Sequence, residues 1–193
     1  MKPKVSVYIA TSLDGYIARK NDDIEWLDEA SVGVPEGEDC GYGELMKTVD
    51  LLVLGRRSYD KVLSFGKWPY VEQAVHVLSS KPIRVPDHIP DKVSCSSETP
   101  LELCERLSAE GVQHIYVDGG QTIQRFLAAG LVDEITITMI PVLLGDGIPL
   151  FGPLPSDINL SCLSATRFDF GFVQLKYGVR QTTDPNSSAP GSS

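Results

Sequence analysis

Short apolar runs recur along the chain, and each is typical of a β-strand. Val5–Ala10 is β-rich and ends in a polar turn, while Leu51–Leu54 is wholly apolar, as expected for a strand buried on both faces. Val75–Leu78 and His114–Val117 have the same character. Glu134–Ile140 alternates apolar and polar residues, the pattern of a strand with one buried face. These runs predict the strands of one sheet.

Segments of helical periodicity separate these strands. One helix is predicted near Asp39–Thr48. Two more show apolar residues at helical spacing: Leu101, Leu103, Cys104 and Leu107 in the first, and Ile123, Phe126 and Leu127 in the second. Thr99-Pro100 is predicted to open the first of these and Gly111 to end it, while Gly130 ends the second.

The connections differ in length and composition. Ser12–Gly37 is rich in turn residues and is predicted to be a long loop, and long ordered loops usually carry function. Pro141–Phe151 is a Gly/Pro-rich turn, and Thr166–Val179 is predicted to form a closing hairpin around Gly171. The Ser/Pro/Gly-rich end, residues 182–193, is predicted to be disordered.

The order of these elements predicts the fold class. Strands alternate with helices for most of the length and antiparallel strands follow, so we expect an α/β fold. Its central sheet should be mixed, mainly parallel and flanked by helices. No internal repeat and no linker divides the sequence. Residues 1–181 are therefore predicted to form a single domain.

Charge and cysteine content restrict the function classes. The 193-residue chain carries a formal net charge of −9, which argues against broad nucleic-acid binding. Its 4 cysteines and 3 histidines are too dispersed for a zinc site or a disulfide framework. No metal is expected, and the cysteines are predicted to be buried small hydrophobes. Because no segment suits a signal peptide or a bilayer span, we expect a cytoplasmic protein with no membrane partner.

Two polar segments directly follow predicted buried strands. Gly55-Arg56-Arg57-Ser58 offers a close backbone approach, two guanidinium groups and a hydroxyl, all suited to phosphate. Ser79-Ser80-Lys81 offers two hydroxyls and an ammonium group, which suit a phosphomonoester. Each segment alone is also explained as an ordinary polar turn. Both follow strands at their carboxyl ends, where ligands of open α/β sheets bind.

A third segment joins a strand to a helix through two glycines. In Val117-Asp118-Gly119-Gly120-Gln121-Thr122, free N–H groups and the positive end of a helix dipole would face outward, as in a pyrophosphate site. The spacing is not the GxGxxG fingerprint, so a standard Rossmann site is only weakly supported. A tight strand-to-helix turn explains this segment equally well. The three segments together favour a dinucleotide.

Five motifs together resemble the dihydrofolate-reductase superfamily. The resemblance is to the branch that contains the reductase domain of bifunctional riboflavin-biosynthesis deaminase-reductases and its small stand-alone relatives. The motifs occur in order over residues 5–180: Ser12–Ala18, Asp50–Tyr59, Val117–Gly120, Gly130–Ile135 and Pro141–Phe151. The set is specific, although each motif alone is not. The resemblance implies a dihydrofolate-reductase-like fold, NADPH as the cofactor and a small-molecule substrate.

The resemblance also implies roles around the cofactor. Ala10 and Ile17 would offer backbone groups to the nicotinamide carboxamide. Gly55-Arg56-Arg57-Ser58 would hold cofactor phosphates, and Ser79-Ser80-Lys81 would surround the adenosine 2′-phosphate. Gly119-Gly120-Gln121-Thr122 would cap the pyrophosphate, with a cis peptide bond near the glycine pair.

On the substrate side, the resemblance implies a smaller set. Trp26 stands where the family's mobile loop carries a tryptophan beside the nicotinamide, although loop packing explains it equally well. Asp39 stands where folate-reducing members have the acid that grips the pteridine, with Thr138 as its hydroxyl partner; helix N-capping is the slightly favoured alternative. Tyr8 stands where the riboflavin branch has a lysine, and Asp118 where that branch often has a glutamate.

Two classes of function follow. The favoured hypothesis is an NADPH-dependent oxidoreductase, of riboflavin-pathway type by its overall motifs but departing from that type at Tyr8, or else a pterin- or dihydrofolate-type reductase. The alternative is a non-catalytic nucleotide-binding module that has lost turnover. A homodimer through the apolar closing strands of Phe168–Val179 is a further expectation. Phe168, Phe170 and Phe172 are predicted to share one strand face, so they could equally belong to the core.

Overall fold

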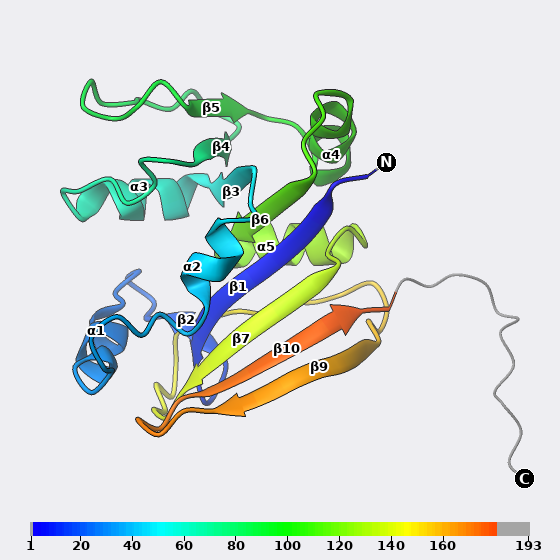
Figure 1. Ribbon diagram of the computed structural model, residues 1–193. Helices are drawn as coiled ribbons and strands as arrows, with labels where there is room; N and C mark the ends of the chain where they lie inside the picture. The colour runs from blue at the N-terminus through cyan, green and yellow to red at the C-terminus, as the bar shows by residue number, and fades with distance from the viewer. Residues whose placement is uncertain (1, 181–193) are drawn as a thin grey trace, which may run out of the picture.

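The computed structural model describes residues 2–180, and Figure 1 labels their helices and strands. The strands are β1 (Lys4–Ser12), β2 (Tyr16–Ala18), β3 (Leu51–Gly55), β4 (Ala74–Leu78), β5 (Val93–Ser96), β6 (His114–Asp118), β7 (Glu134–Ile140), β8 (Ile148–Pro149), β9 (Leu160–Arg167) and β10 (Val173–Val179). The helices are α1 (Glu25–Ser31), α2 (Tyr42–Met46), α3 (Arg56–Ser64), α4 (Pro100–Ala109) and α5 (Gly120–Ala128).

One mixed sheet runs through the molecule. Its 8 strands follow the order β5-β4-β3-β6-β1-β7-β10-β9. Neighbouring strands from β5 to β7 are parallel, and β10 and β9 continue the sheet as antiparallel strands. The chain starts near the middle with β1, builds β3, β4 and β5 outward on one side, and returns through β6 (Figure 1). The predicted mixed, mainly parallel sheet with antiparallel C-terminal strands is confirmed.

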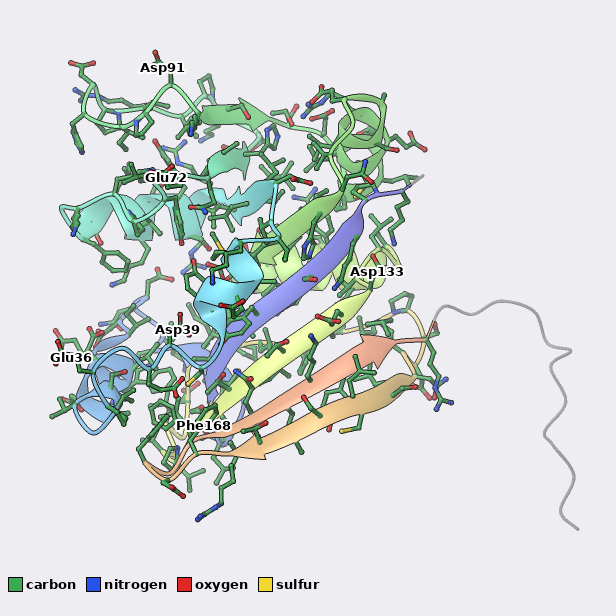
Figure 2. All side chains as sticks on the ribbon, in the orientation of Figure 1. Glu36, Asp39, Glu72, Asp91, Asp133 and Phe168 are labelled. Atoms are coloured by element: carbon green, nitrogen blue, oxygen red, sulfur yellow. The ribbon has the colours of Figure 1, made fainter. Side chains whose placement is uncertain are left out.

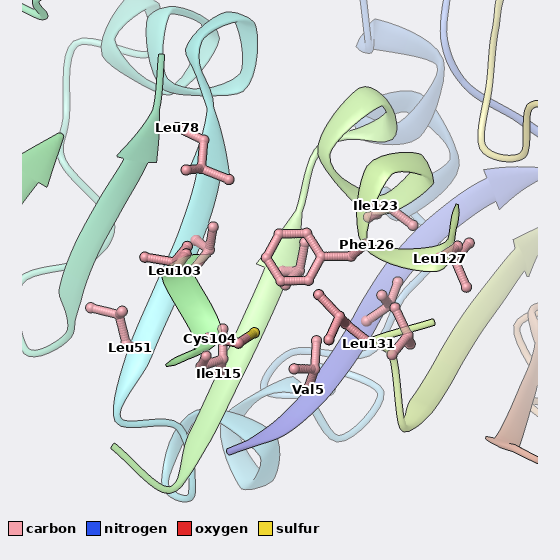
Figure 3. Close-up of a cluster of buried hydrophobic side chains, with 14 of the residues drawn as sticks. Val5, Leu51, Leu78, Leu103, Cys104, Ile115, Ile123, Phe126, Leu127 and Leu131 are labelled. Atoms are coloured by element: carbon pink, nitrogen blue, oxygen red, sulfur yellow. The ribbon is translucent and has the colours of Figure 1, made fainter. Parts of the chain in front are cut away.

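Helices cover both faces of the parallel strands, which explains why β3 is wholly apolar. Leu51 and Val53 pack with side chains of α4 and α5, whereas Leu52 and Leu54 pack on the other face with α2 and α3. Figure 1 shows α5 behind the sheet and α2 in front of it. Figure 3 shows Phe126 of α5 lying against the strands within the first of these cores.

The predicted loop over Ser12–Gly37 is wrong in part, because the segment contains β2 and α1. Trp26 is the one buried residue of α1, and it packs in a third apolar cluster with Ile140 and Phe172. A seven-residue helix held by a single large side chain has no repeating apolar face. Its pattern therefore could not be separated from that of a loop.

The closing hairpin is confirmed, although its strands and aromatic residues differ from expectation. The first strand, β9, begins at Leu160 rather than Thr166. The phenylalanines do not share a strand face, because Phe168, Phe170 and Phe172 lie in the turn before β10. Their rings stand 5.0 Å apart in successive pairs, and Phe172 is buried beside Trp26. β9 forms one edge of the sheet, and the homodimer stays a prediction.

Smaller departures have simple causes. The predicted helix at Asp39–Thr48 is limited to α2, and β5 was missed because its sequence, VSCS, is mostly small and polar. All four cysteines are free, but Cys95 and Cys162 are exposed, so predicting them as buried was wrong. Residues 182–193 lie outside the described residues. Within residues 2–180, no helix has the length and apolar character needed to cross a membrane.

Candidate active site at the carboxyl ends of the strands

A cavity of about 730 Å³ opens at the carboxyl ends of the parallel strands. Ala10 near the end of β1, Gly55 of β3, Leu78 of β4 and Asp118 of β6 all line it, and Glu98 lines it just beyond β5. This edge is where open α/β sheets bind ligands, beside a point where the strand order reverses. The volume falls within the range of about 300–1,000 Å³ that is typical of small-molecule sites.

Every residue predicted to bind the cofactor lines this cavity. They are Ala10, Ile17, Gly55, Arg56, Arg57, Ser58, Ser79, Ser80, Lys81, Gly119, Gly120, Gln121 and Thr122. None of the four predicted substrate residues lines it: Tyr8, Trp26, Asp39 and Thr138. The structure therefore brings the three polar segments together and leaves the substrate-side set outside.

The segments after β3 and β6 fit closely because two glycines lack a side chain. A Cβ atom at Gly55 would lie less than 3 Å from the Thr122 hydroxyl, and one at Gly119 less than 3 Å from the Ser58 hydroxyl. Gly119 also has a φ of +95°, a conformation that residues other than glycine rarely adopt. The start of α3 and the start of α5 therefore lie in close contact beside the cavity.

Two helices present their N-termini beside the cavity without a side-chain cap. α3 starts after Gly55 and α5 after Gly119, and neither has a side-chain hydrogen bond at its N-cap or an acidic residue in its first turn. In contrast, Thr99 and Glu102 close the start of α4 with a reciprocal capping box. The free N–H groups of α3 and α5 provide two positive helix ends for an anion.

Arg56 and Arg57 are adjacent in the sequence but bond to different partners. Arg56 donates from Nε to Asp60 (2.8 Å) and from Nη1 to the Pro82 carbonyl (3.1 Å), so it lies beside the segment after β4. Arg57 donates from Nη2 to both carboxylate oxygens of Asp22 at 2.8 Å, on the segment before α1. Both ion pairs are exposed and therefore weak enough for a ligand phosphate to replace.

The segment after β4 is ordered by its own serine. The Ser79 hydroxyl donates to the Lys81 carbonyl (2.7 Å) and accepts from the Lys81 N–H (3.2 Å), which closes a tight turn. Lys81 lines the cavity beyond this turn. Ser80 and Lys81 therefore line the same part of the cavity as Arg56, which bonds the neighbouring Pro82.

Asp118 is a candidate functional residue that the prediction did not place in the site. It ends β6 at the cavity, where its Oδ1 accepts the Gly119 N–H at 2.7 Å. Burial raises the pKa of the Asp118 carboxyl to about 6, and no ion pair with a described residue opposes this effect. Tyr70, also in the cavity lining, has a pKa raised well above its usual value by burial and by the nearby Asp118 charge. A perturbed acid in a cleft is a hallmark of active sites.

Tyr8 and Thr138 meet on the sheet surface outside the cavity lining. The Gln174 amide donates to the Tyr8 hydroxyl (3.0 Å), the Thr138 hydroxyl (3.0 Å) and the Cys40 carbonyl (2.9 Å). The Tyr8 hydroxyl in turn donates to the Cys40 carbonyl at 2.7 Å, and burial raises the Tyr8 pKa to about 12. Gln174 was not predicted, because only strand pairing places it beside β7.

The contacts of Asp39 and Trp26 support the local fold and do not reach the cavity. The Asp39 carboxylate accepts the N–H groups of Gly41 and Gly43, both at 2.8 Å, so it does not bond Thr138. Figure 2 shows Asp39 on the segment that leads into α2. Trp26 is 3% exposed within the cluster of Ile140 and Phe172. Trp26 therefore packs in the core, as the packing interpretation expects. Asp39 is not the N-cap of α2, because that residue is Gly41 and carries no side-chain cap, but its carboxylate does accept one N–H of the first turn of α2.

The peptide bonds at the glycine pair also differ from the family expectation. No cis peptide bond occurs within residues 2–180, so the expected cis bond near Gly119 and Gly120 is absent there. The chain passes from β6 into α5 through Gly119, which has a positive φ.

Comparison with known proteins identifies the family. A model of the RibD C-terminal domain matches residues 3–174. The chain belongs to the RibD C-terminal domain family. This family is the reductase domain of riboflavin-biosynthesis enzymes, which confirms the resemblance that the sequence motifs carry.

Two proteins resemble the chain over nearly the whole length of both partners. The chain is 37% identical to the uncharacterized protein YwjB of Bacillus subtilis, over 92% of this chain and 98% of that protein. A putative riboflavin biosynthesis protein from Shewanella sp. PV-4 matches with a TM-score of 0.86 and 40% identity, over 94% of this chain and 100% of the other.

A larger protein shares the fold at lower identity. Acinetobacter baumannii RibD matches with a TM-score of 0.68 and 17% identity, over 93% of this chain. The chain spans 58% of that longer protein. This likeness extends to the fold alone.

Proposed function

We propose that this protein is an NADPH-dependent reductase that transfers a hydride to a small heterocyclic, imine or carbonyl substrate. The type that we propose is the 5-amino-6-(5-phosphoribosylamino)uracil reductase of riboflavin biosynthesis. The observation that carries the proposal is the convergence of three polar strand ends on one cavity, with two uncapped helix N-termini beside it. Membership of the RibD C-terminal domain family supports the reductase chemistry.

The donor set of the cavity fits a phosphorylated dinucleotide. The starts of α3 and α5 would hold the pyrophosphate through free backbone N–H groups. Arg56, Ser80 and Lys81 would hold the adenosine 2′-phosphate at the end nearest β4. Ile17 and Ala10 would meet the nicotinamide at the opposite end. When bound, the cofactor supplies the hydride, and the protein positions it and excludes water.

The apolar part of the cavity lining is the proposed substrate side. Ile24 and Leu27 line the cavity beside α1, and Tyr70 lines it after α3. A planar ring would lie against these side chains and within reach of the Asp118 carboxyl. Because Oδ1 accepts the Gly119 N–H, Asp118 would carry its proton on Oδ2 and donate it as the hydride arrives. A pterin-type site would depend on Asp39, whose carboxylate instead binds the backbone N–H groups of Gly41 and Gly43 at the start of α2.

Separate substitution of the two arginines tests the proposed orientation of the cofactor. Arg56→Gln is expected to weaken NADPH by about tenfold or more and NADH by much less, because Arg56 lies at the proposed 2′-phosphate end. Arg57→Gln is expected to weaken both cofactors equally, because Arg57 points toward Asp22 on the other side. Isothermal titration of both variants with both cofactors measures the difference.

Arg125→Gln is the matched control, since Arg125 also lines the cavity but belongs to the last turn of α5, far from its N-terminus. Arg125→Gln should leave the affinity for NADPH and the affinity for NADH unchanged. If Arg56→Gln lowers the affinity for NADH as much as that for NADPH, Arg56 does not recognise the 2′-phosphate.

A further inference from the structure

Two motifs that are 130 residues apart in sequence form one structural unit beside the cavity. The turn after β1 and the segment after β7 are joined by the short β2–β8 ladder. Backbone bonds from Leu13 N–H to the Val142 carbonyl (2.9 Å) and from Leu150 N–H to the Gly15 carbonyl (3.0 Å) close both ends. Of this unit, Ile17 and Ile148 line the cavity.

Asp14 is the centre of this unit. Its Oδ1 accepts from the Ser12 hydroxyl (2.6 Å) and the Leu144 N–H (3.1 Å), and its Oδ2 accepts from the Gly145 N–H (2.7 Å). The Ser12 hydroxyl also accepts the Tyr16 N–H at 3.0 Å. These bonds to the charged form lower the pKa of the Asp14 carboxyl, so it is ionised at neutral pH. One exposed carboxylate therefore ties the start of β2 to the segment after β7.

The unit places Ile17 at the cavity wall. The β2–β8 register pairs Tyr16 with Pro149 and Ala18 with Ile148, and it shifts between them, so Ile17 stands at a β-bulge without a partner in the register. Bulges of this kind redirect a residue beside an active site. Ile17 and Ile148 both line the cavity, and the Ile17 side chain lies against Gly120 at the start of α5.

The fit between the two segments allows little movement. A Cβ atom at Gly147 would lie less than 3 Å from the Ala18 carbonyl, so β8 can approach β2 only through a glycine. The Gln124 amide of α5 donates to the Pro149 and Leu150 carbonyls at 3.2 Å each. The position of Ile17 relative to α5 is therefore set by contacts on both sides of β8.

We infer that Asp14 is a positioning residue: its carboxylate clamps the segment after β7 onto β2, and this clamp fixes the Ile17 bulge that receives a primary carboxamide at the nicotinamide end of the cavity. The inference rests on the proposed function for the identity of the ligand. Asp14 does not line the cavity, so it acts on the ligand only through the geometry of Ile17 and Ile148.

Two probes separate this role from general stability. Under the proposed function, NADPH would occupy the whole cavity, whereas adenosine 2′,5′-bisphosphate has no nicotinamide and would occupy only the end near β4. Asp14→Asn is expected to weaken NADPH at least fivefold and to leave adenosine 2′,5′-bisphosphate within twofold, measured by isothermal titration. Gly147→Ala, which pushes β8 away from β2, is expected to give the same split.

Asp133→Asn is the matched control. The Asp133 carboxylate also accepts a backbone N–H, from Val5 at 2.8 Å, but at the opposite end of β1. It should leave both affinities unchanged. The inference is overturned if both Asp14→Asn and Gly147→Ala leave NADPH affinity within twofold, or weaken both probes equally. If the unmodified protein binds neither probe, the proposed function fails first and the inference falls with it.

Discussion

Replacing Gly119 by alanine is expected to weaken NADPH binding by at least a hundredfold. The new methyl group would lie less than 3 Å from the Ser58 hydroxyl, and the φ of +95° disfavours any side chain. Backbone strain of this kind costs on the order of 1–3 kcal/mol, and relief by moving the chain would misalign the start of α5. Titration calorimetry with NADPH measures the loss, and circular dichroism checks that the variant folds.

Two other glycines separate strain from crowding. Gly130→Ala adds a side chain at a φ of +66° but meets no atom within 4 Å, so it should cost some stability and leave NADPH affinity unchanged. Gly55→Ala has an ordinary φ of −80° but crowds the Thr122 hydroxyl, so it should weaken binding without strain at the residue itself. Equal NADPH affinity for Gly119→Ala and Gly130→Ala would rule out the proposed pyrophosphate site.

Replacing Asp118 by asparagine is expected to lower turnover by at least a hundredfold with little change in NADPH affinity. Proton donation by a positioned acid typically contributes about 10²–10⁴-fold. Asparagine keeps an oxygen to accept the Gly119 N–H but has no proton to donate. With a pKa of about 6, the unmodified protein should lose kcat/KM as pH rises through 6 and Asp118 ionises. NADPH oxidation at 340 nm with the phosphoribosylamino-uracil substrate measures both effects.

The stability of the same variant provides an independent control. Burial raises the folded-state pKa of Asp118 from 3.8 to about 6, so the unmodified protein loses stability as pH rises across that interval. The shift corresponds to about 2–3 kcal/mol at most. Asp118→Asn should therefore be the more stable protein at pH 8, with the advantage fading toward pH 4 in urea unfolding. A variant that is less stable at pH 8 would show that the carboxylate supports the fold.

The cofactor side of the site could be predicted because it depends on local sequence. Gly55, Leu78 and Asp118 each end an apolar run, and parallel strands place their carboxyl ends at one edge of the sheet. Recognising the strands was therefore enough to bring the following polar residues together. Sequence did not separate Arg56 from Arg57, because the distant partners that distinguish them, Pro82 and Asp22, become neighbours only through folding.

The substrate side depends on distant contacts, which a single sequence does not reveal. Asp39 is an acid of the kind that can bind a heterocycle, yet its carboxylate accepts the N–H groups of Gly41 and Gly43 at the start of α2. Trp26 lies in a segment with loop-like composition, yet it anchors a helix in the core. In the sequence, Asp118 is only one residue of a strand-to-helix turn. Its burial beside tyrosines and the absence of an opposing charge are properties of the folded structure, so the sequence did not single it out.

Direct titration of the intact protein with NADPH is the most decisive measurement. The chain has tryptophans whose fluorescence can report binding, and calorimetry gives the stoichiometry. The proposed function predicts one NADPH per chain, with clearly higher affinity than NADH. Failure of both NADPH and NADH to bind at millimolar concentration would contradict the central claim that this cavity holds a dinucleotide.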